Sequence, residues 1–123
     1  MNILGNKLTD FAGTITSVTV TETGMVVNVQ NETGPFGNVL YTVTLEPAIV
    51  PKGETGAHTI RGQAFSPEGE TLKFSGRGVW RSSGSNHRIL KHITLLEDGQ
   101  RMLAVDNFDF TEQTASGSVY ALD

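Results

Sequence analysis

The stretch that decides the fold runs from His87 to Phe110 and reads HRILKHITLLEDGQRMLAVDNFDF. Two runs rich in Ile, Leu and Val flank an Asp-Gly pair, which is a strong signal for a β-hairpin. A two-residue turn at Asp98-Gly99 sets Lys91 opposite Asp106 and Arg88 opposite Asp109. Both pairs join opposite charges. This register therefore predicts a buried Lys91–Asp106 ion pair on the apolar face of the hairpin.

The other face of the same hairpin is also rich in apolar side chains. It carries Leu90, Leu96, Leu103 and Val105 among polar neighbours that include His92 and Thr94. Contiguous apolar residues on an outer surface indicate contact with another subunit. A second sheet of the same chain would explain them equally well. We expect a homo-oligomer with Leu90, Leu103 and Val105 at or near the interface.

Alternation of apolar and polar residues extends over almost the whole chain, and no window shows the helical spacing i, i+3, i+4, i+7. The chain is therefore predicted to be all-β. Turn residues such as Thr23-Gly24 and Gly34-Pro35-Phe36-Gly37 separate the runs. Eight strands are expected, over residues 13–22, 25–31, 38–45, 57–65, 71–81, 87–97, 100–110 and 115–122.

A second hairpin can be registered from Pro67-Glu68-Gly69, which suits a three-residue loop with glycine in the left-handed position. Ala64 then faces Leu72, and His58 faces Gly78, so small residues oppose large ones. Glycines inside strands are typical of strongly coiled strands. We predict an eight-stranded antiparallel up-and-down barrel, with a two-sheet β-sandwich as the alternative.

Length and composition limit the function classes. The 123 residues form one domain, residues 1–123, and the mild net charge of −4, without a basic run, argues against nucleic acid. The chain has no cysteine, so it has neither a disulfide framework nor a thiolate nucleophile. No apolar run is long enough for a membrane span. A soluble, cytoplasmic protein without a membrane partner is expected.

Two glycine-rich segments carry a family resemblance: Gly34-Pro35-Phe36-Gly37 before Asn38-Val39-Leu40-Tyr41, and Phe74-Ser75-Gly76-Arg77-Gly78-Val79-Trp80. In this pattern the chain resembles small barrels of the allene oxide cyclase and dirigent type, including uncharacterised bacterial barrel proteins. The resemblance implies an antiparallel barrel, often trimeric, with a pocket in its mouth. It implies no catalytic position.

Four residues form the predicted pocket: His58, Trp80, Lys91 and Asp106. They are the polar or amphipathic groups at inward positions of neighbouring strands, which suits a small apolar or amphipathic ligand. The alternatives are purely structural: Lys91 and Asp106 form an ion pair that fixes the register, and His58 is a hydrogen-bonded core histidine. No metal site is predicted, because His87 and His92 are five residues apart and so lie on opposite faces of a strand, while His58 is on another hairpin. No cofactor is expected.

The sequence favours a non-catalytic oligomeric module that binds a small ligand or a partner. One alternative is an isomerase or cyclase that uses His58 or Asp106 in proton transfer. Another is a self-modifying protein in which Lys91 condenses with Asp106, or with Asp109 in a different register, to form an amide with loss of water. The sequence favours a binding protein over an enzyme.

Overall fold

The computed structural model describes residues 4–49 and 53–122. Its strands are β1 (Leu4–Thr21), β2 (Gly24–Glu32), β3 (Asn38–Ala48), β4 (Thr55–Phe65), β5 (Thr71–Ser82), β6 (His87–Leu96), β7 (Arg101–Asp109) and β8 (Thr114–Leu122). A short 3₁₀ helix, η1 (Gly34–Phe36), joins β2 to β3. The strand β1 begins well before its predicted start at Gly13.

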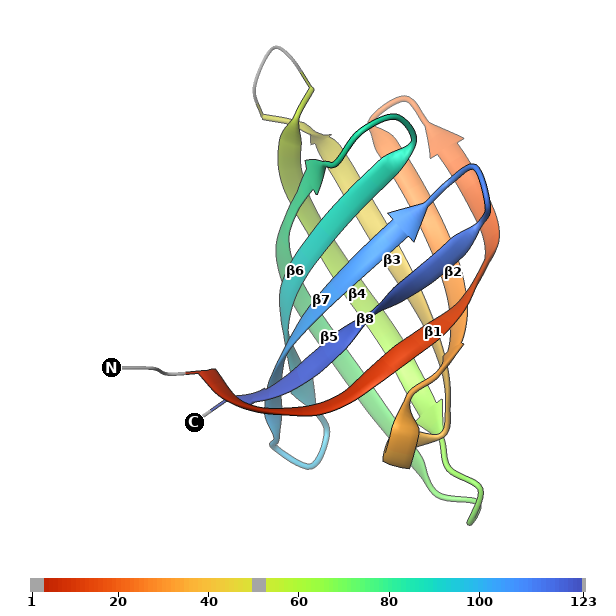
Figure 1. Cartoon of the computed structure of the whole chain (residues 1–123), viewed down its shortest axis with the longest axis vertical. Helices are drawn as coiled ribbons and strands as arrows, with labels where there is room; N and C mark the ends of the chain where they lie inside the picture. The colour runs from red at the N-terminus through yellow and green to blue at the C-terminus, as the bar shows by residue number, and fades with distance from the viewer. Residues whose placement is uncertain (1–3, 50–52, 123) are drawn as a thin grey trace.

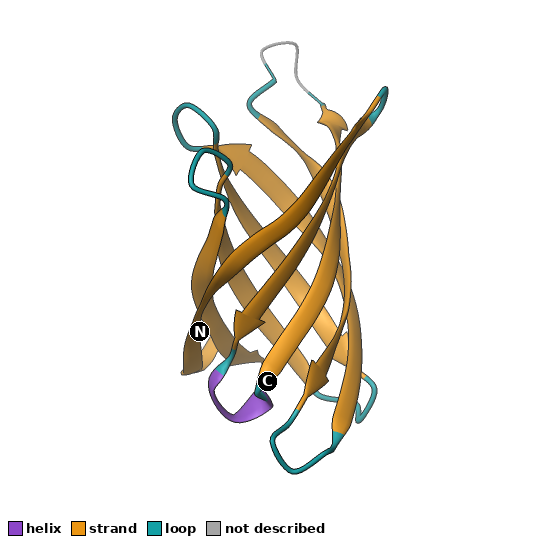
Figure 2. Ribbon diagram, turned by 90° about the vertical axis from the view of Figure 1, so that its right-hand side faces the viewer, coloured by secondary structure: helices purple, strands orange, loops and turns teal. Residues whose placement is uncertain are grey.

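Each strand pairs antiparallel with the next, and β1 also pairs with β8, so the sheet closes into an eight-stranded barrel (Figure 1). The predicted up-and-down barrel is confirmed, and the sandwich alternative is wrong. Closure leaves no free sheet edge, which removes the risk of edge-to-edge aggregation. In Figure 2 the helix η1 lies at one end of the barrel, together with the β4–β5 and β6–β7 turns. We call this end the η1 end.

The predicted register of the β4–β5 hairpin is confirmed. Ala64 pairs with Leu72 and His58 pairs with Gly78. The loop closes through a 2.9 Å hydrogen bond from the Ser66 N–H to the Glu70 carbonyl, and Gly69 has a φ of 87°. Glycine is needed at this position because side chains rarely adopt positive φ.

The predicted register of the β6–β7 hairpin is wrong by one residue. The turn is a three-residue loop, in which the Leu96 N–H bonds the Gln100 carbonyl at 2.9 Å. Gly99 has a φ of 93°, whereas a two-residue type I′ turn also needs a positive φ at Asp98, which is not found. A one-residue slip moves every side chain of a strand to the opposite face. Lys91 therefore lies opposite Val105, and Asp106 lies opposite Leu90.

This slip inverts the predicted faces of β6 but not those of β7. Leu90, predicted at a subunit interface, is a fully buried core residue, and His92 and Thr94 also point inward. The apolar side chains on the outer surface are instead Ile93 and Leu95, which are more than half exposed. Arg88 does not face Asp109; His87 does, with 3.1 Å between its Nε2 and a carboxylate oxygen of Asp109.

Candidate ligand site inside the barrel

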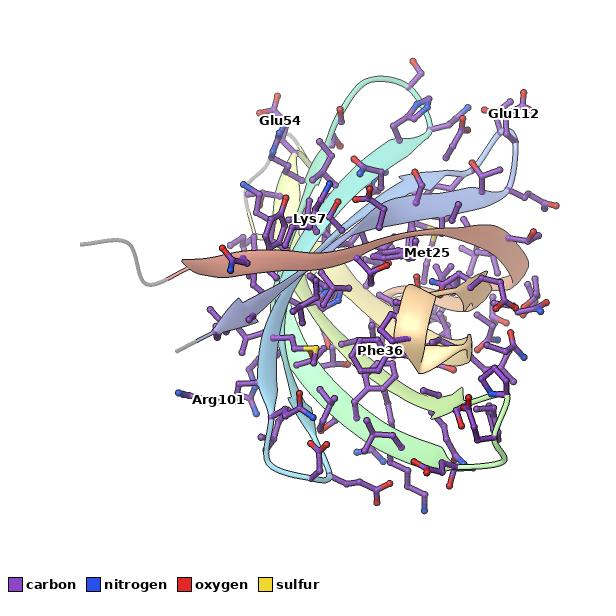
Figure 3. The ribbon with its side chains drawn as sticks, turned by 60° about the horizontal axis from the view of Figure 1, so that its bottom comes forward. Lys7, Met25, Phe36, Glu54, Arg101 and Glu112 are labelled. Atoms are coloured by element: carbon purple, nitrogen blue, oxygen red, sulfur yellow. The ribbon has the colours of Figure 1, made fainter. Side chains whose placement is uncertain are left out.

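A cavity of about 80 Å³ lies inside the barrel toward its η1 end, since its wall includes Thr33 and Phe36. Most of its wall is apolar. The wall extends from the fully buried Asp106 to the partly exposed Phe36, Leu72 and Phe74, so the cavity reaches the surface at that end. Figure 3 looks toward this end and labels Phe36, which belongs to η1. The polar side chains in the wall are Asn31, Thr33, Tyr41, His92, Thr94 and Asp106.

A chain of side-chain hydrogen bonds crosses the cavity wall and ends at Asp106. The Thr33 hydroxyl donates to the side-chain Oδ1 of Asn31, and Asn31 Nδ2 donates to the Tyr41 hydroxyl at 3.2 Å. Tyr41 Oη in turn donates to Asp106 Oδ2 at 2.7 Å. The other carboxyl oxygen, Asp106 Oδ1, is buried without a hydrogen-bond partner among the described residues. The chain of donors therefore orients the carboxyl group and leaves one oxygen unused.

Burial governs the ionisation of this carboxyl group. Desolvation raises the pKa of Asp106 from 3.8 to about 7, and the Tyr41 hydroxyl and the Asn107 backbone N–H partly oppose this rise. The Asn107 N–H does not meet hydrogen-bond geometry with Oδ1, which stays without a partner among the described residues. Burial and the neighbouring carboxylate raise the pKa of Tyr41 well above its usual value, so this residue remains a donor. Near neutral pH, the Asp106 carboxyl group can thus either give or accept a proton.

Two histidines form a second polar contact in the interior. His58 Nε2 and His92 Nδ1 are 3.1 Å apart, and the rings meet edge to face. They come from β4 and β6, on either side of Gly78 in β5, and both residues pair with that glycine. Because Gly78 has no side chain, the two imidazoles can meet above it. Desolvation lowers the pKa of His58 to about 4 and that of His92 to about 3, so both rings are neutral near pH 7.

The structure separates the four predicted pocket residues. Asp106 lines the cavity, and His58 lies behind its wall, in contact with His92. Trp80 is buried elsewhere in the core, where its indole N–H donates to the Glu46 carbonyl at 3.1 Å. Lys91 is exposed on the outer face of β6. The predicted Lys91–Asp106 ion pair does not exist, and the two residues cannot condense because they lie on opposite faces of the barrel wall.

Sequence reasoning missed Tyr41, His92, Asn31 and Thr33 as interior polar groups. For all of these except Thr33, which lies between β2 and η1, a position on the inward face of a strand was the available signal. For Asn31 and Tyr41 the signal was the alternation with Val29 and Val43, which are buried on the same faces. For His92 this signal could not be read, because the length of the β6–β7 loop determines which face of β6 carries this residue.

A larger hollow of about 730 Å³ lies on the outer surface over β3 to β6. Its wall includes the exposed Leu40, Phe65 and Leu95 together with Arg61 and Lys73. The described part of the chain places no unpartnered buried polar atom there. The smaller interior cavity is therefore the candidate site, because an unsatisfied buried carboxyl oxygen marks it.

Comparisons of the chain with protein-family models, curated proteins and solved structures find no match. Within residues 4–49 and 53–122, no three His, Asp or Glu side chains are grouped so as to hold a metal ion. Over the same residues, no helix is long and apolar enough to cross a membrane. The cavity and its polar groups are therefore the features that indicate a function.

Proposed function

We propose that this protein is a binding module for a small amphipathic ligand whose polar head enters the barrel at the η1 end. One observation carries the proposal: Asp106 Oδ1 is buried, unpartnered and located at the inner end of a largely apolar cavity. A buried polar atom without a partner costs about 1–3 kcal/mol. A ligand that bonds this oxygen recovers that free energy, and apolar walls with few polar groups are typical of ligand sites.

The size of the cavity limits the part of the ligand that it holds. Its volume of about 80 Å³ is roughly half that of a cavity that takes benzene. The head group therefore fits inside, while an alkyl tail extends past Phe36, Leu72 and Phe74 toward the surface. These three side chains form the apolar opening through which the ligand enters the cavity.

The proposal is tested by titrating the protein with 2-heptanone, a neutral amphipathic probe, using isothermal titration calorimetry. Ala104 lines the cavity, and Ala104→Leu should fill it and abolish the binding seen with the wild type. The control Ala57→Leu makes the same change at an exposed position of β4 and should bind like the wild type. Equal affinity of wild type and Ala104→Leu would place the ligand elsewhere.

A second candidate is an isomerase or cyclase, favoured by a carboxyl group of pKa about 7 inside a cavity. In this reaction Asp106 Oδ1 takes a proton from the carbon next to a carbonyl group, the C–H electrons form an enolate, and the proton returns to carbon. Deuterium exchange at those carbons of 2-heptanone in heavy water measures this step. Exchange that the wild type catalyses and Asp106→Asn abolishes would support the enzyme. An exchange rate with the wild type equal to that in buffer alone would contradict the enzyme and leave binding as the function.

The proposed module is a homo-oligomer. Val79, Ile93 and Leu95 are each more than half exposed on neighbouring strands β5 and β6. Leu103 and Val105 on β7 continue this apolar surface, because they pair with Ile93 and Lys91. Sedimentation should show an oligomer that Ile93→Glu dissociates. A monomeric wild type at micromolar concentration would contradict it.

A further inference from the structure

The inner end of the cavity presents two polar groups of different kinds. Asp106 and His92 lie on adjacent strands, β7 and β6, and both face inward. Since Asp106 pairs with Leu90 and Ala104 pairs with His92, the two side chains are diagonal neighbours on one face. Such neighbours are within reach of one small molecule. A ligand head at this position meets both side chains together.

The carboxyl group of Asp106 offers a hydrogen-bond acceptor. Its Oδ2 is already bonded to the Tyr41 hydroxyl, whereas its Oδ1 has no partner. When Asp106 is ionised, Oδ1 requires a donor, and neither Tyr41 nor the two histidines supplies one to it. A ligand N–H or O–H group satisfies this oxygen.

The histidine pair determines what His92 offers. If His58 donates from Nε2, its unpartnered Nδ1 is a bare lone pair, and His92 carries its own proton on Nε2. If His92 donates instead, His58 has a buried N–H group without an acceptor. Orphaned buried N–H groups are rarer than unsatisfied acceptors. The first arrangement is therefore favoured, and the ring nitrogen of His92 not bonded to His58 is a donor.

We infer that the natural ligand carries a carboxamide head, or an equivalent group with an N–H donor beside a C=O acceptor. The N–H bonds Asp106 Oδ1, and the carbonyl accepts from His92 Nε2. This inference rests on the proposed function. A carboxylate head is excluded by charge, because the described residues of the cavity wall include no Lys or Arg and an ionised Asp106 repels it.

Three probes of equal size separate these head groups. Hexanamide, 2-heptanone and hexanoate each have the same five-carbon tail and differ only in the head. Calorimetric titration at pH 8.5, where Asp106 is ionised, should show hexanamide binding at least about tenfold more tightly than 2-heptanone, as expected for one added hydrogen bond. Hexanoate should not bind measurably.

Variants test the assignment of each bond. Asp106→Leu should remove the preference for hexanamide over 2-heptanone. His92→Phe should instead weaken both probes by a similar factor and keep the preference, because both probes carry the carbonyl group that His92 binds. The matched control is Thr94→Val, which changes another polar residue of the same cavity wall. The Thr94 hydroxyl donates to the Met102 carbonyl within the sheet and is not assigned to the ligand. Thr94→Val should keep the preference. If either test variant fails to fold, the wild-type probe series still decides.

The possible failures are distinguishable. Equal affinity of the wild type for hexanamide and 2-heptanone overturns the carboxamide inference and leaves the proposed binding function standing. Absence of binding by all three probes overturns both. Tight binding of hexanoate also overturns the inference, because it requires a cation that the cavity wall lacks.

Discussion

Tyr41 and Asp106 meet across the lumen of the barrel, where the Tyr41 hydroxyl donates a 2.7 Å hydrogen bond to Asp106 Oδ2. The two residues belong to β3 and β7, which are separated by three strands in either direction around the closed sheet. The bond therefore joins opposite walls of the barrel. It also fixes which oxygen of Asp106 remains available inside the cavity.

Tyr41→Phe should reduce the free energy of unfolding by about 1–3 kcal/mol, because Asp106 loses its donor inside the core. The same change should raise the pKa of Asp106 above its value of about 7, since the Tyr41 hydrogen bond favours the ionised form. Chemical denaturation and carboxyl ¹³C NMR titration measure the two effects. Tyr120→Phe, at a partly exposed position of β8, should change neither.

Asp106→Asn should become more stabilising, relative to the wild type, as the pH rises. The folded-state pKa of Asp106 lies near 7, above its ordinary 3.8, so its favourable contribution is complete below 3.8 and is lost as the pH rises through 7. Asparagine does not titrate. The stability difference between the two proteins should therefore change by on the order of 4 kcal/mol between pH 4 and pH 8. Urea denaturation measures this difference. A difference in the free energy of unfolding that stays constant from pH 4 to pH 8 would contradict the burial of the Asp106 carboxyl group.

The histidine pair should make the protein sensitive to acid. The pKa values of His58 and His92 are lowered from 6.5 to about 4 and about 3, so their contribution is complete above pH 6.5 and is lost as the pH falls through these values. Replacing both by leucine should flatten the decline in stability between pH 6.5 and pH 4. An unchanged slope in acid denaturation would show that other groups control the acid response.

Gly78→Ala should destabilise the barrel by about 3 kcal/mol or more, at the upper end of overpacking costs. A Cβ atom at this position would lie 1.8 Å from the Lys91 carbonyl oxygen and 2.7 Å from the His92 Cα. Backbone atoms must therefore move, and the contact between His58 and His92 is disturbed. Thermal unfolding compares this variant with Ser75→Ala, an exposed change in the same strand that should have little effect. Similar melting temperatures for the two variants would be the contrary result.

The barrel could be predicted because several independent signals agree. Alternation, short connections and glycines within strands all favour strongly coiled antiparallel strands. The β4–β5 register followed from Gly69, whose positive φ the loop requires. The resemblance to allene oxide cyclase and dirigent barrels remains a prediction, because the comparisons return no relative.

The register of β6 could not be obtained from its own pattern. Both faces of this strand carry large apolar residues, with Leu90 and Leu96 on one and Ile93 and Leu95 on the other. Hydrophobic patterning fixes a register only when one face is clearly polar. The turn then decided the assignment, and Asp-Gly is compatible with both two- and three-residue loops. A two-residue loop predicts Lys91 inside and His92 outside, the reverse of their positions in the structure.

The most direct measurement is a carboxyl ¹³C NMR titration that gives the pKa of Asp106 in the free protein and in protein saturated with hexanamide. A head that donates to Oδ1 favours the ionised form, so hexanamide should lower this pKa, by about one unit if the ionised form binds tenfold more tightly. Saturation with 2-heptanone should not lower it. An Asp106 pKa that stays near 7 in the hexanamide complex would contradict a ligand head bound at this oxygen.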